Sequence, residues 1–189
     1  MKTLIITILV TTLILTPTSG SELTDDSATL VETSVKQNKP FLRASDMKAP
    51  TDIEKRKVWL KNLLHEVGFR GDRLKTAWAV AMRESTGRPK AHNPNRSTGD
   101  NSYGIFQVNM IGELGVARRD KFELKSNEQL FNPVLNAEIV FYMTKKGTDW
   151  SSWDINENGY NGGVGETKFR QWLKHYPKVK LWKNQNKSR

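Results

Sequence analysis

Residues 81–109, AMRESTGRPKAHNPNRSTGDNSYGIFQVN, decide how the rest of the sequence is interpreted. An apolar helical pattern ends there on a single acid, Glu84. A polar segment rich in Asn, Ser, Thr and Gly follows, and the apolar-leaning stretch 103–109 then predicts a short strand. Two questions follow from this stretch: why an apolar helix ends on a carboxylate, and whether a second acid accompanies it.

Glu84 continues the apolar face of its helix. At 100° per residue it lies about 20° from Ala77 and about 60° from Ala81. A carboxyl group in that position loses hydration, which raises its pKa and favours the protonated form. Such a group can donate a proton to a leaving oxygen near neutral pH. The alternative is a last-turn glutamate that simply pairs with Arg83 or Arg88.

The remaining sequence predicts a predominantly helical α+β domain with one small β element between helices. The first helix is predicted to start at a capping box formed by Thr51 and Glu54 and to stop at Gly68. The other predicted helices cover 72–85 with Asp72 as N-cap, 132–147 with Asn132-Pro133 at its start, and 166–176.

The N-terminal segment has the features of an export signal. Lys2 precedes the apolar run 4–15, and small residues up to Gly20 give a cleavage site. The run is shorter than the roughly 20 residues that span a bilayer, although a retained anchor is the alternative. We therefore expect a signal peptide at 1–20, a flexible linker at 21–50, the folded domain at 51–180 and a basic tail at 181–189.

The charge distribution favours an anionic partner, and nucleic acid, acidic lipid headgroups and anionic cell-wall polymers all qualify. The chain has 30 Lys and Arg against 20 Asp and Glu, and residues 167–189 contain eight basic residues and no acid. The chain has no cysteine, which excludes disulfides, thiol catalysis and Cys-ligated zinc. The three histidines lack metal-ligand spacing, so neither a metal site nor a cofactor is expected.

Four motifs resemble, in their order, the lysozyme-like superfamily, and within it the soluble lytic transglycosylase and goose-type lysozyme branch, including phage-borne forms. They are Glu84-Ser85 at a helix end, the stretch 103–109, Asn132-Pro133 with Asn136-Ala137, and Tyr160-Asn161-Gly162-Gly163, in which Gly162 replaces the alanine of the family. The resemblance spans about residues 70–165. It implies a lysozyme-like domain with a small β-hairpin or sheet between its helices.

The resemblance also implies a reaction and a set of site residues. The reaction is cleavage of the β-1,4 bond between N-acetylmuramic acid (MurNAc) and N-acetylglucosamine (GlcNAc) in peptidoglycan, with Glu84 as general acid and then base. The implied substrate-binding residues are Ser85, Tyr103, Gln107, Asn109, Tyr160 and Asn161.

This resemblance further implies where the protein works and what it binds. We expect a secreted, monomeric protein of the cell wall or periplasm, with no transmembrane helix after signal cleavage and no dedicated nucleic-acid binding. Its partners would be peptidoglycan strands and, through the basic C-terminus, anionic wall polymers.

A second carboxylate would separate two mechanisms. A hydrolase usually uses two carboxylates, whereas a lytic transglycosylase needs one acid, because the muramyl 6-hydroxyl attacks and forms a 1,6-anhydro ring. Ser102 stands where c-type lysozymes, which the strand also resembles, have an aspartate. Asp100 is the nearest acid, and it is also a typical turn residue beside Gly99. The sequence therefore favours the single-acid transglycosylase.

Two alternatives remain. One is an inverting lysozyme that uses Asp100 to position water, and the other is a non-catalytic, cationic wall-binding protein on the same fold. Trp150 and Trp153 fit either stacking on sugar rings or packing in the core.

Overall fold

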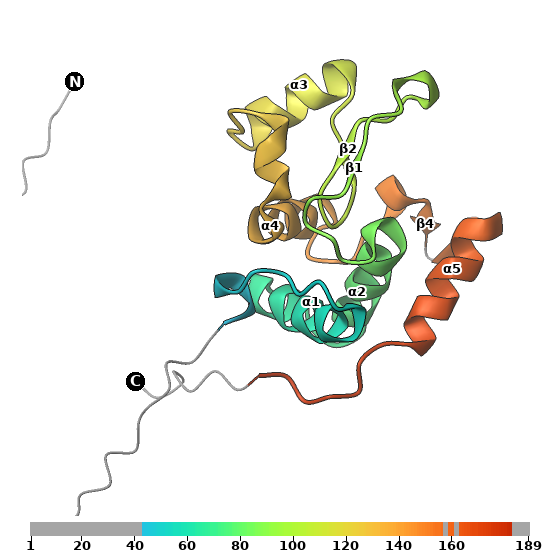
Figure 1. Cartoon of the computed structure of the whole chain (residues 1–189). Coiled ribbons are helices and arrows are strands. Elements are labelled where there is room, and N and C mark those ends of the chain that lie inside the picture. The colour runs from blue at the N-terminus through green and yellow to red at the C-terminus, as the bar shows by residue number, and fades with distance from the viewer. Residues whose placement is uncertain (1–42, 157–158, 161–162, 183–189) are drawn as a thin grey trace, which may run out of the picture. The chain divides into compact units, whose positions relative to one another are not determined.

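The computed structural model describes residues 43–156, 159–160 and 163–182. Within these residues, five α-helices alternate with short 3-10 helices and two small antiparallel sheets (Figure 1). In chain order the elements are η1 (Ala44–Asp46), α1 (Ile53–Val67), α2 (Gly71–Ser85), β1 (His92–Asn93), η2 (Arg96–Thr98), β2 (Ser102–Tyr103), β3 (Val108–Asn109), α3 (Gly112–Lys121), η3 (Asn127–Phe131), α4 (Pro133–Met143), η4 (Ser151–Trp153), β4 (Ile155–Asn156), β5 (Gly159–Tyr160) and α5 (Gly163–Lys174). The predicted fold class, mostly helical with a small sheet between helices, is confirmed.

Helix α2 is the centre of the core. Every residue from Ala77 to Met82 is fully buried, and the helix packs against both α1 and α5. Trp78 joins the three helices, because its indole N–H donates to the Lys57 carbonyl of α1 (3.0 Å) and its ring meets Trp172 of α5 edge-on. The burial that the sequence predicts for this helix is therefore present on nearly all sides.

The helix starts differ in detail from the sequence prediction. Asp52 caps α1, because its carboxylate accepts the Lys55 N–H (2.9 Å), so the predicted capping box of Thr51 and Glu54 is wrong. Helix α2 starts at Gly71 without a side-chain cap, which places Asp72 inside the first turn. There the carboxylate still interacts favourably with the helix dipole.

Residues 43–50 belong to the folded unit and not to a flexible linker. The Glu66 carboxylate of α1 accepts the backbone N–H groups of Ala44 (2.7 Å) and Ser45 (2.9 Å). The Trp59 indole donates to the Ala44 carbonyl (2.9 Å), and Ala44 is fully buried. The sequence missed this attachment because it depends on side chains of a later helix. The predicted signal peptide, 1–20, lies outside the described residues.

The predicted strand 103–109 is two strands joined by a tight turn. Strand β2 pairs antiparallel with β1 on one side and β3 on the other, and Tyr103 lies opposite Val108. Gly104 makes the turn possible, since it has a φ of 79° and a Cβ there would lie 2.3 Å from Asn136 and from the Leu130 carbonyl. Periodicity alone cannot reveal such a reversal within seven residues.

The fully buried side chain of Asn136, in α4, holds this turn. Its amide oxygen accepts the Phe106 N–H (3.1 Å), and its amide nitrogen donates to the carbonyls of Tyr103 (3.0 Å) and Leu130 (3.1 Å). Two other elements bond the same turn. Ser85 Oγ donates to the Ile105 carbonyl (2.7 Å), and the Trp153 indole donates to the Phe106 carbonyl (2.9 Å). The turn is thus tied to α2, α4 and η4.

Helix α4 begins as predicted. Asn132 accepts the N–H groups of Val134 and Leu135, and Pro133 occupies the first turn. The helix ends at Met143, four residues before the predicted stop at Gly147. Helix α3, in contrast, has no counterpart in the sequence prediction. Only Gly115 of this helix is buried, and its sequence has no apolar stripe from which the helix could be predicted.

The C-terminal segment returns along α1. Lys61 donates to the carbonyls of Pro177 (2.8 Å) and Val179 (2.6 Å), and the Trp182 N–H donates to Asn62 (2.7 Å). Trp182, predicted to lie in the basic tail 181–189, is therefore attached to the domain. Residues 183–189 lie outside the described residues.

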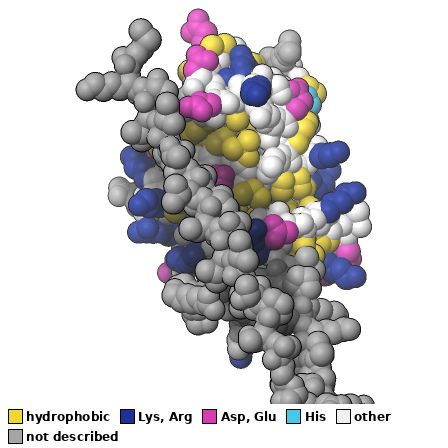
Figure 2. All heavy atoms as spheres, turned by 90° about the vertical axis from the view of Figure 1, so that its left-hand side faces the viewer, with side chains coloured by type: hydrophobic (Ala, Val, Ile, Leu, Met, Phe, Trp, Pro, Cys, Tyr) yellow, Lys and Arg dark blue, Asp and Glu magenta, His cyan; other side chains and the backbone are white. Residues whose placement is uncertain are grey.

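Among the described residues, no helix is both long and apolar enough to cross a membrane. On the face shown in Figure 2, hydrophobic side chains gather in the middle and Lys and Arg side chains lie around them. The most exposed large hydrophobic residues of the described chain are Tyr142, Val116, Val179 and Leu114.

The Asn136 bonds give a direct test of how the turn is held. Replacing Asn136 by Ala removes three hydrogen bonds from buried backbone groups, and each loss costs about 1–3 kcal/mol. We expect the free energy of unfolding to fall by at least about 3 kcal/mol, measured by denaturant titration. Asn132→Ala, which removes only a helix cap, should cost about 1 kcal/mol. Equal losses in the two variants would contradict the central position of Asn136.

Candidate active site

A cleft of about 500 Å³ opens beside the C-terminal end of α2. Its walls come from α2, the segment from η2 to β3, α3, the end of α4, and η4. The lining residues are Arg83, Glu84, Thr98, Gly99, Asp100, Ser102, Gln107, Val108, Asn109, Leu114, Arg118, Met143, Ser152, Trp153 and Asp154. Segments far apart in the sequence thus meet around Glu84.

Glu84 is the penultimate residue of α2, and its side chain is 19% exposed. Its carboxylate forms an ion pair with the Arg83 guanidinium. Glu84 thus pairs with a neighbouring arginine, as the alternative interpretation predicted, and it also lines the cleft. Arg88 instead donates to the backbone carbonyl of Ser85.

Burial dominates the electrostatics of Glu84. Desolvation raises the pKa of its carboxyl above the ordinary value of 4.5, and the Arg83 charge and hydrogen bond offset only part of this effect. The nearby charges of Asp100 and Asp154 raise this pKa further. A carboxyl with a raised pKa beside an open cleft matches what a general acid requires.

Asp100 lies in the cleft as the sequence suggested, held by neighbouring side chains. Its carboxylate accepts hydrogen bonds from Ser102 and from Asn93. Its negative charge also raises the pKa of Glu84. Asp100 is therefore both a turn residue and a carboxylate of the cleft.

Asp154 is a cleft carboxylate that the sequence analysis missed. It follows η4 in a left-handed backbone conformation (φ 57°), which Asp tolerates better than most residues. Its N–H donates to the Ser151 carbonyl (3.1 Å), which fixes the turn. No local motif marks this residue, because its place in the cleft depends on how η4 packs under the 104–107 turn through Trp153.

Gln107 lines the cleft and has an unusual backbone conformation. Its φ of 50° is left-handed, which is uncommon for a residue other than Gly and recurs at ligand sites. Its amide nitrogen donates to the carbonyls of Ala91 (3.1 Å) and Gly104 (2.9 Å). These bonds fix the side chain as part of the wall.

Of the other predicted binding residues, one lines the cleft and two are buried beside it. Asn109 lines the cleft, but its amide bonds the backbone of Asn101, Ile111 and Gly99. Ser85 and Tyr103 are buried and do not line the cleft. Ser85 instead bonds the 104–107 turn, and Tyr103 stacks on a histidine of β1. The polar groups of Ser85 and Asn109 are therefore engaged by the backbone of the protein itself.

Two further predicted binding residues remain predictions. The backbone of Tyr160 pairs with Ile155 between β5 and β4. The side chain of Tyr160 and all of Asn161 lie outside the described residues.

The two tryptophans of the η4 region are core residues. Trp150 is 5% exposed and Trp153 is 8% exposed, and their rings contact each other and Phe106. Trp153 also borders the cleft. Core packing is therefore their main structural role, and Trp153 adds an aromatic edge to the wall.

Comparison with known proteins bears directly on this arrangement. The family model described as a lysozyme-like domain matches residues 61–155, which is half of the chain and includes Glu84, Asp100, Gln107 and Asp154. The chain belongs to the lysozyme-like domain family. No curated protein matches the chain, and no solved structure does.

Membership of this family indicates a peptidoglycan-cleaving activity directed at glycosidic bonds. The lysozyme-like domain thus has the cell wall as its place of action and peptidoglycan as its substrate. The match ends at Ile155, before Tyr160 and Asn161, so it does not reach the last motif of the sequence analysis.

The raised pKa of Glu84 predicts a pH-dependent stability. Between 4.5 and the higher folded-state pKa, the folded protein binds more protons than the unfolded chain. Stability from the protonated carboxyl is thus fully present below pH 4.5 and is lost as pH rises through the folded pKa. Because glutamine does not titrate, Glu84→Gln removes this pH-dependent loss of stability. The free energy of unfolding of the variant, relative to the wild type, should increase from about pH 4 to about pH 8.

Denaturant titrations at several pH values measure this difference. The exposed Glu113→Gln serves as a control for the removal of one carboxylate at the surface. A relative stability of Glu84→Gln that falls with pH would mean that ion pairing outweighs burial at this carboxyl.

Proposed function

We propose that the protein is an exported lytic transglycosylase that cleaves the MurNAc-β-1,4-GlcNAc bond of peptidoglycan with Glu84 as its acid and base. The observation that supports this proposal most is the desolvated carboxyl of Glu84 in a cleft of about 500 Å³. The cleft is large enough for part of a glycan strand and is lined mainly by polar groups that can bond sugar hydroxyls.

The proposed reaction begins with protonated Glu84. Its proton passes to the glycosidic oxygen as the bond from that oxygen to C1 of MurNAc breaks. The resulting carboxylate then takes the proton of the muramyl 6-hydroxyl, and the 6-oxygen bonds C1 to close the 1,6-anhydro ring. Glu84 ends protonated, so one carboxyl suffices for the whole cycle.

The protein groups around Glu84 support both halves of the cycle. Burial, Asp100 and Asp154 favour the protonated form before cleavage. Arg83 stabilises the carboxylate that forms afterwards, because it already bonds Glu84. The balance of these effects keeps the pKa raised without preventing ionisation.

A hydrolytic lysozyme is the second candidate. Asp100 and Asp154 line the same cleft as Glu84, and either carboxylate could hold a water molecule for attack on C1. Asp100 already accepts bonds from Ser102 and Asn93, which limits its freedom as a base. The transglycosylase needs neither residue and is preferred for that reason.

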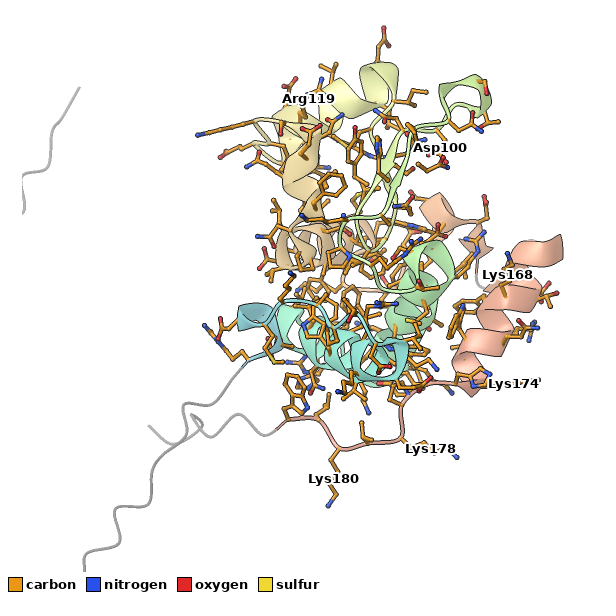
Figure 3. All side chains as sticks on the ribbon, viewed as in Figure 1. Asp100, Arg119, Lys168, Lys174, Lys178 and Lys180 are labelled. Atoms are coloured by element: carbon orange, nitrogen blue, oxygen red, sulfur yellow. The ribbon has the colours of Figure 1, made fainter. Side chains whose placement is uncertain are left out.

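Export and attachment to anionic wall polymers complete the proposal. The proposed signal peptide is 1–20. Lys168 and Lys174 of α5, together with Lys178 and Lys180 of the following segment, are exposed, and Figure 3 shows them on the side of the domain away from Arg119. Such basic side chains favour contact with teichoic acids or with peptidoglycan carboxylates.

Glu84→Gln tests the enzymatic proposal against a non-catalytic wall-binding protein. The variant cannot donate a proton, so release of soluble fragments from purified peptidoglycan should fall at least about a hundredfold, while sedimentation with the wall is retained. Glu113→Gln should release fragments at the wild-type rate. Equal release by the wild type and Glu84→Gln would refute catalysis by Glu84.

Mass spectrometry of the fragments distinguishes the two reactions. Anhydro-muramyl ends are expected for the transglycosylase. Reducing muramyl ends would instead support the lysozyme and give Asp100 or Asp154 a catalytic role.

The charge of Asp154 predicts a shift in the pH dependence of cleavage. Asp154→Asn removes a negative charge that raises the pKa of Glu84, so the alkaline limb of the rate profile should move to lower pH. Asp100→Asn should move it in the same direction. An unchanged alkaline limb in both variants would show that neither carboxylate acts on Glu84.

A further inference from the structure

Arg118 lines the cleft from a wall that the sequence analysis did not foresee. It lies on α3, is half-buried, and lines the cleft together with Leu114, one turn earlier on the same helix face. The acids of this cleft are Glu84, Asp100 and Asp154, and Arg83 is its other cation. None of the ion pairs formed among the described residues involves Arg118.

The position of Arg118 is fixed by the backbone beneath it. One guanidinium nitrogen donates to the carbonyl of Asn109 in β3. Gly115 allows α3 to pack this closely, since a Cβ there would lie 2.1 Å from the Met110 carbonyl. Arg118 is therefore held at the wall of the cleft by a supported helix, as a ligand-binding residue requires.

A half-buried guanidinium bonded to one carbonyl keeps most of its bonding capacity. Arg has five N–H donors in a planar fork that fits a carboxylate with two parallel bonds. Burial lowers the pKa of Arg118, so its charge is partly desolvated, and no carboxylate of the described residues forms an ion pair with it. An anionic group on a ligand would supply that partner.

We propose that Arg118 is a specificity-determining residue that binds a carboxylate on the side chain of a muramyl unit. This inference rests on the proposed action on peptidoglycan and names a feature of the substrate that the cleft selects. The carboxylate can come from a stem peptide in intact strands or from the free lactyl group in peptide-free strands. Leu114 and Met143, which also line the cleft, provide apolar surface for the neighbouring methyl groups.

The test measures binding rather than turnover. All proteins carry Glu84→Gln, so that the ligands survive, and calorimetric titration gives the dissociation constants. The ligands are a peptide-bearing GlcNAc-MurNAc oligomer and its peptide-free counterpart, each in its acid form and with its carboxylates converted to amides. Arg118→Gln removes the charge and Arg118→Lys keeps it.

Arg119→Gln is the matched control. Arg119 is the next residue of α3, is also half-buried, and bonds Asn127 outside the cleft (2.8 Å). In Figure 3 the label of Arg119 lies at α3, to the left of Asp100, which lines the cleft.

Amidation should weaken binding to the protein with Arg118 by about tenfold to a hundredfold, the usual contribution of a bond to a charged group. The same amidation should change binding to Arg118→Gln by less than about twofold, with Arg118→Lys in between and Arg119→Gln like the parent. Loss of discrimination with the peptide-bearing pair alone identifies the stem peptide, and loss with the peptide-free pair identifies the lactyl group.

Discrimination that survives in Arg118→Gln, or that is lost equally in Arg119→Gln, would overturn the proposal. So would a parent protein that binds acid and amide forms equally. Circular dichroism checks that each variant is folded. If Arg118→Gln does not fold, the weaker discrimination expected of Arg118→Lys relative to the parent tests the proposal in its place. Failure of the proposed cleavage would appear instead as unchanged fragment release in Glu84→Gln alone, and the binding comparison would still stand.

Discussion

The hydrogen bonds of the Asn136 amide to the 103–106 backbone are the constraint on which the site depends. The peptide groups of so tight a turn have few partners within the turn itself. On the surface water would hydrate them, but here they are buried and need protein partners. Asn136 bonds the Tyr103 carbonyl and the Phe106 N–H. Ser85 and Trp153 donate to the carbonyls of Ile105 and Phe106, respectively. Because these partners come from α4, α2 and η4, bonding the turn also brings the walls of the cleft together.

This arrangement explains why an apolar helix ends on a carboxylate. Ser85 anchors the last turn of α2 under the sheet, so the preceding residue, Glu84, is held at the edge of the core with 19% of its side chain exposed. Burial then raises its pKa, and Arg83, Asp100 and Asp154 adjust the balance. The core thus stabilises the fold and also raises the pKa of the proposed acid.

The parts of the structure that follow local rules could be predicted from the sequence, and the rest depends on long-range packing. Apolar periodicity gave α1, α2 and α4, and the Asn132-Pro133 pair marked the start of α4. Helix α3 escaped prediction because it buries almost nothing, and the turn at Gly104 escaped because a seven-residue apolar stretch looks like one strand. At the site, Glu84, Asp100 and Gln107 follow from motif and burial. Asp154 and Arg118 do not, since η4 and α3 reach the cleft only through tertiary contacts.

The central claim is that the protein holds Glu84 in its protonated form to higher pH than water would. Carbon-13 NMR of the side-chain carboxyl, assigned with Glu84→Gln, measures this directly in the folded protein. The account predicts a titration midpoint for Glu84 above the ordinary value of 4.5. A midpoint at or below 4.5 would mean that the ion pair with Arg83 outweighs burial, and would contradict Glu84 as a general acid.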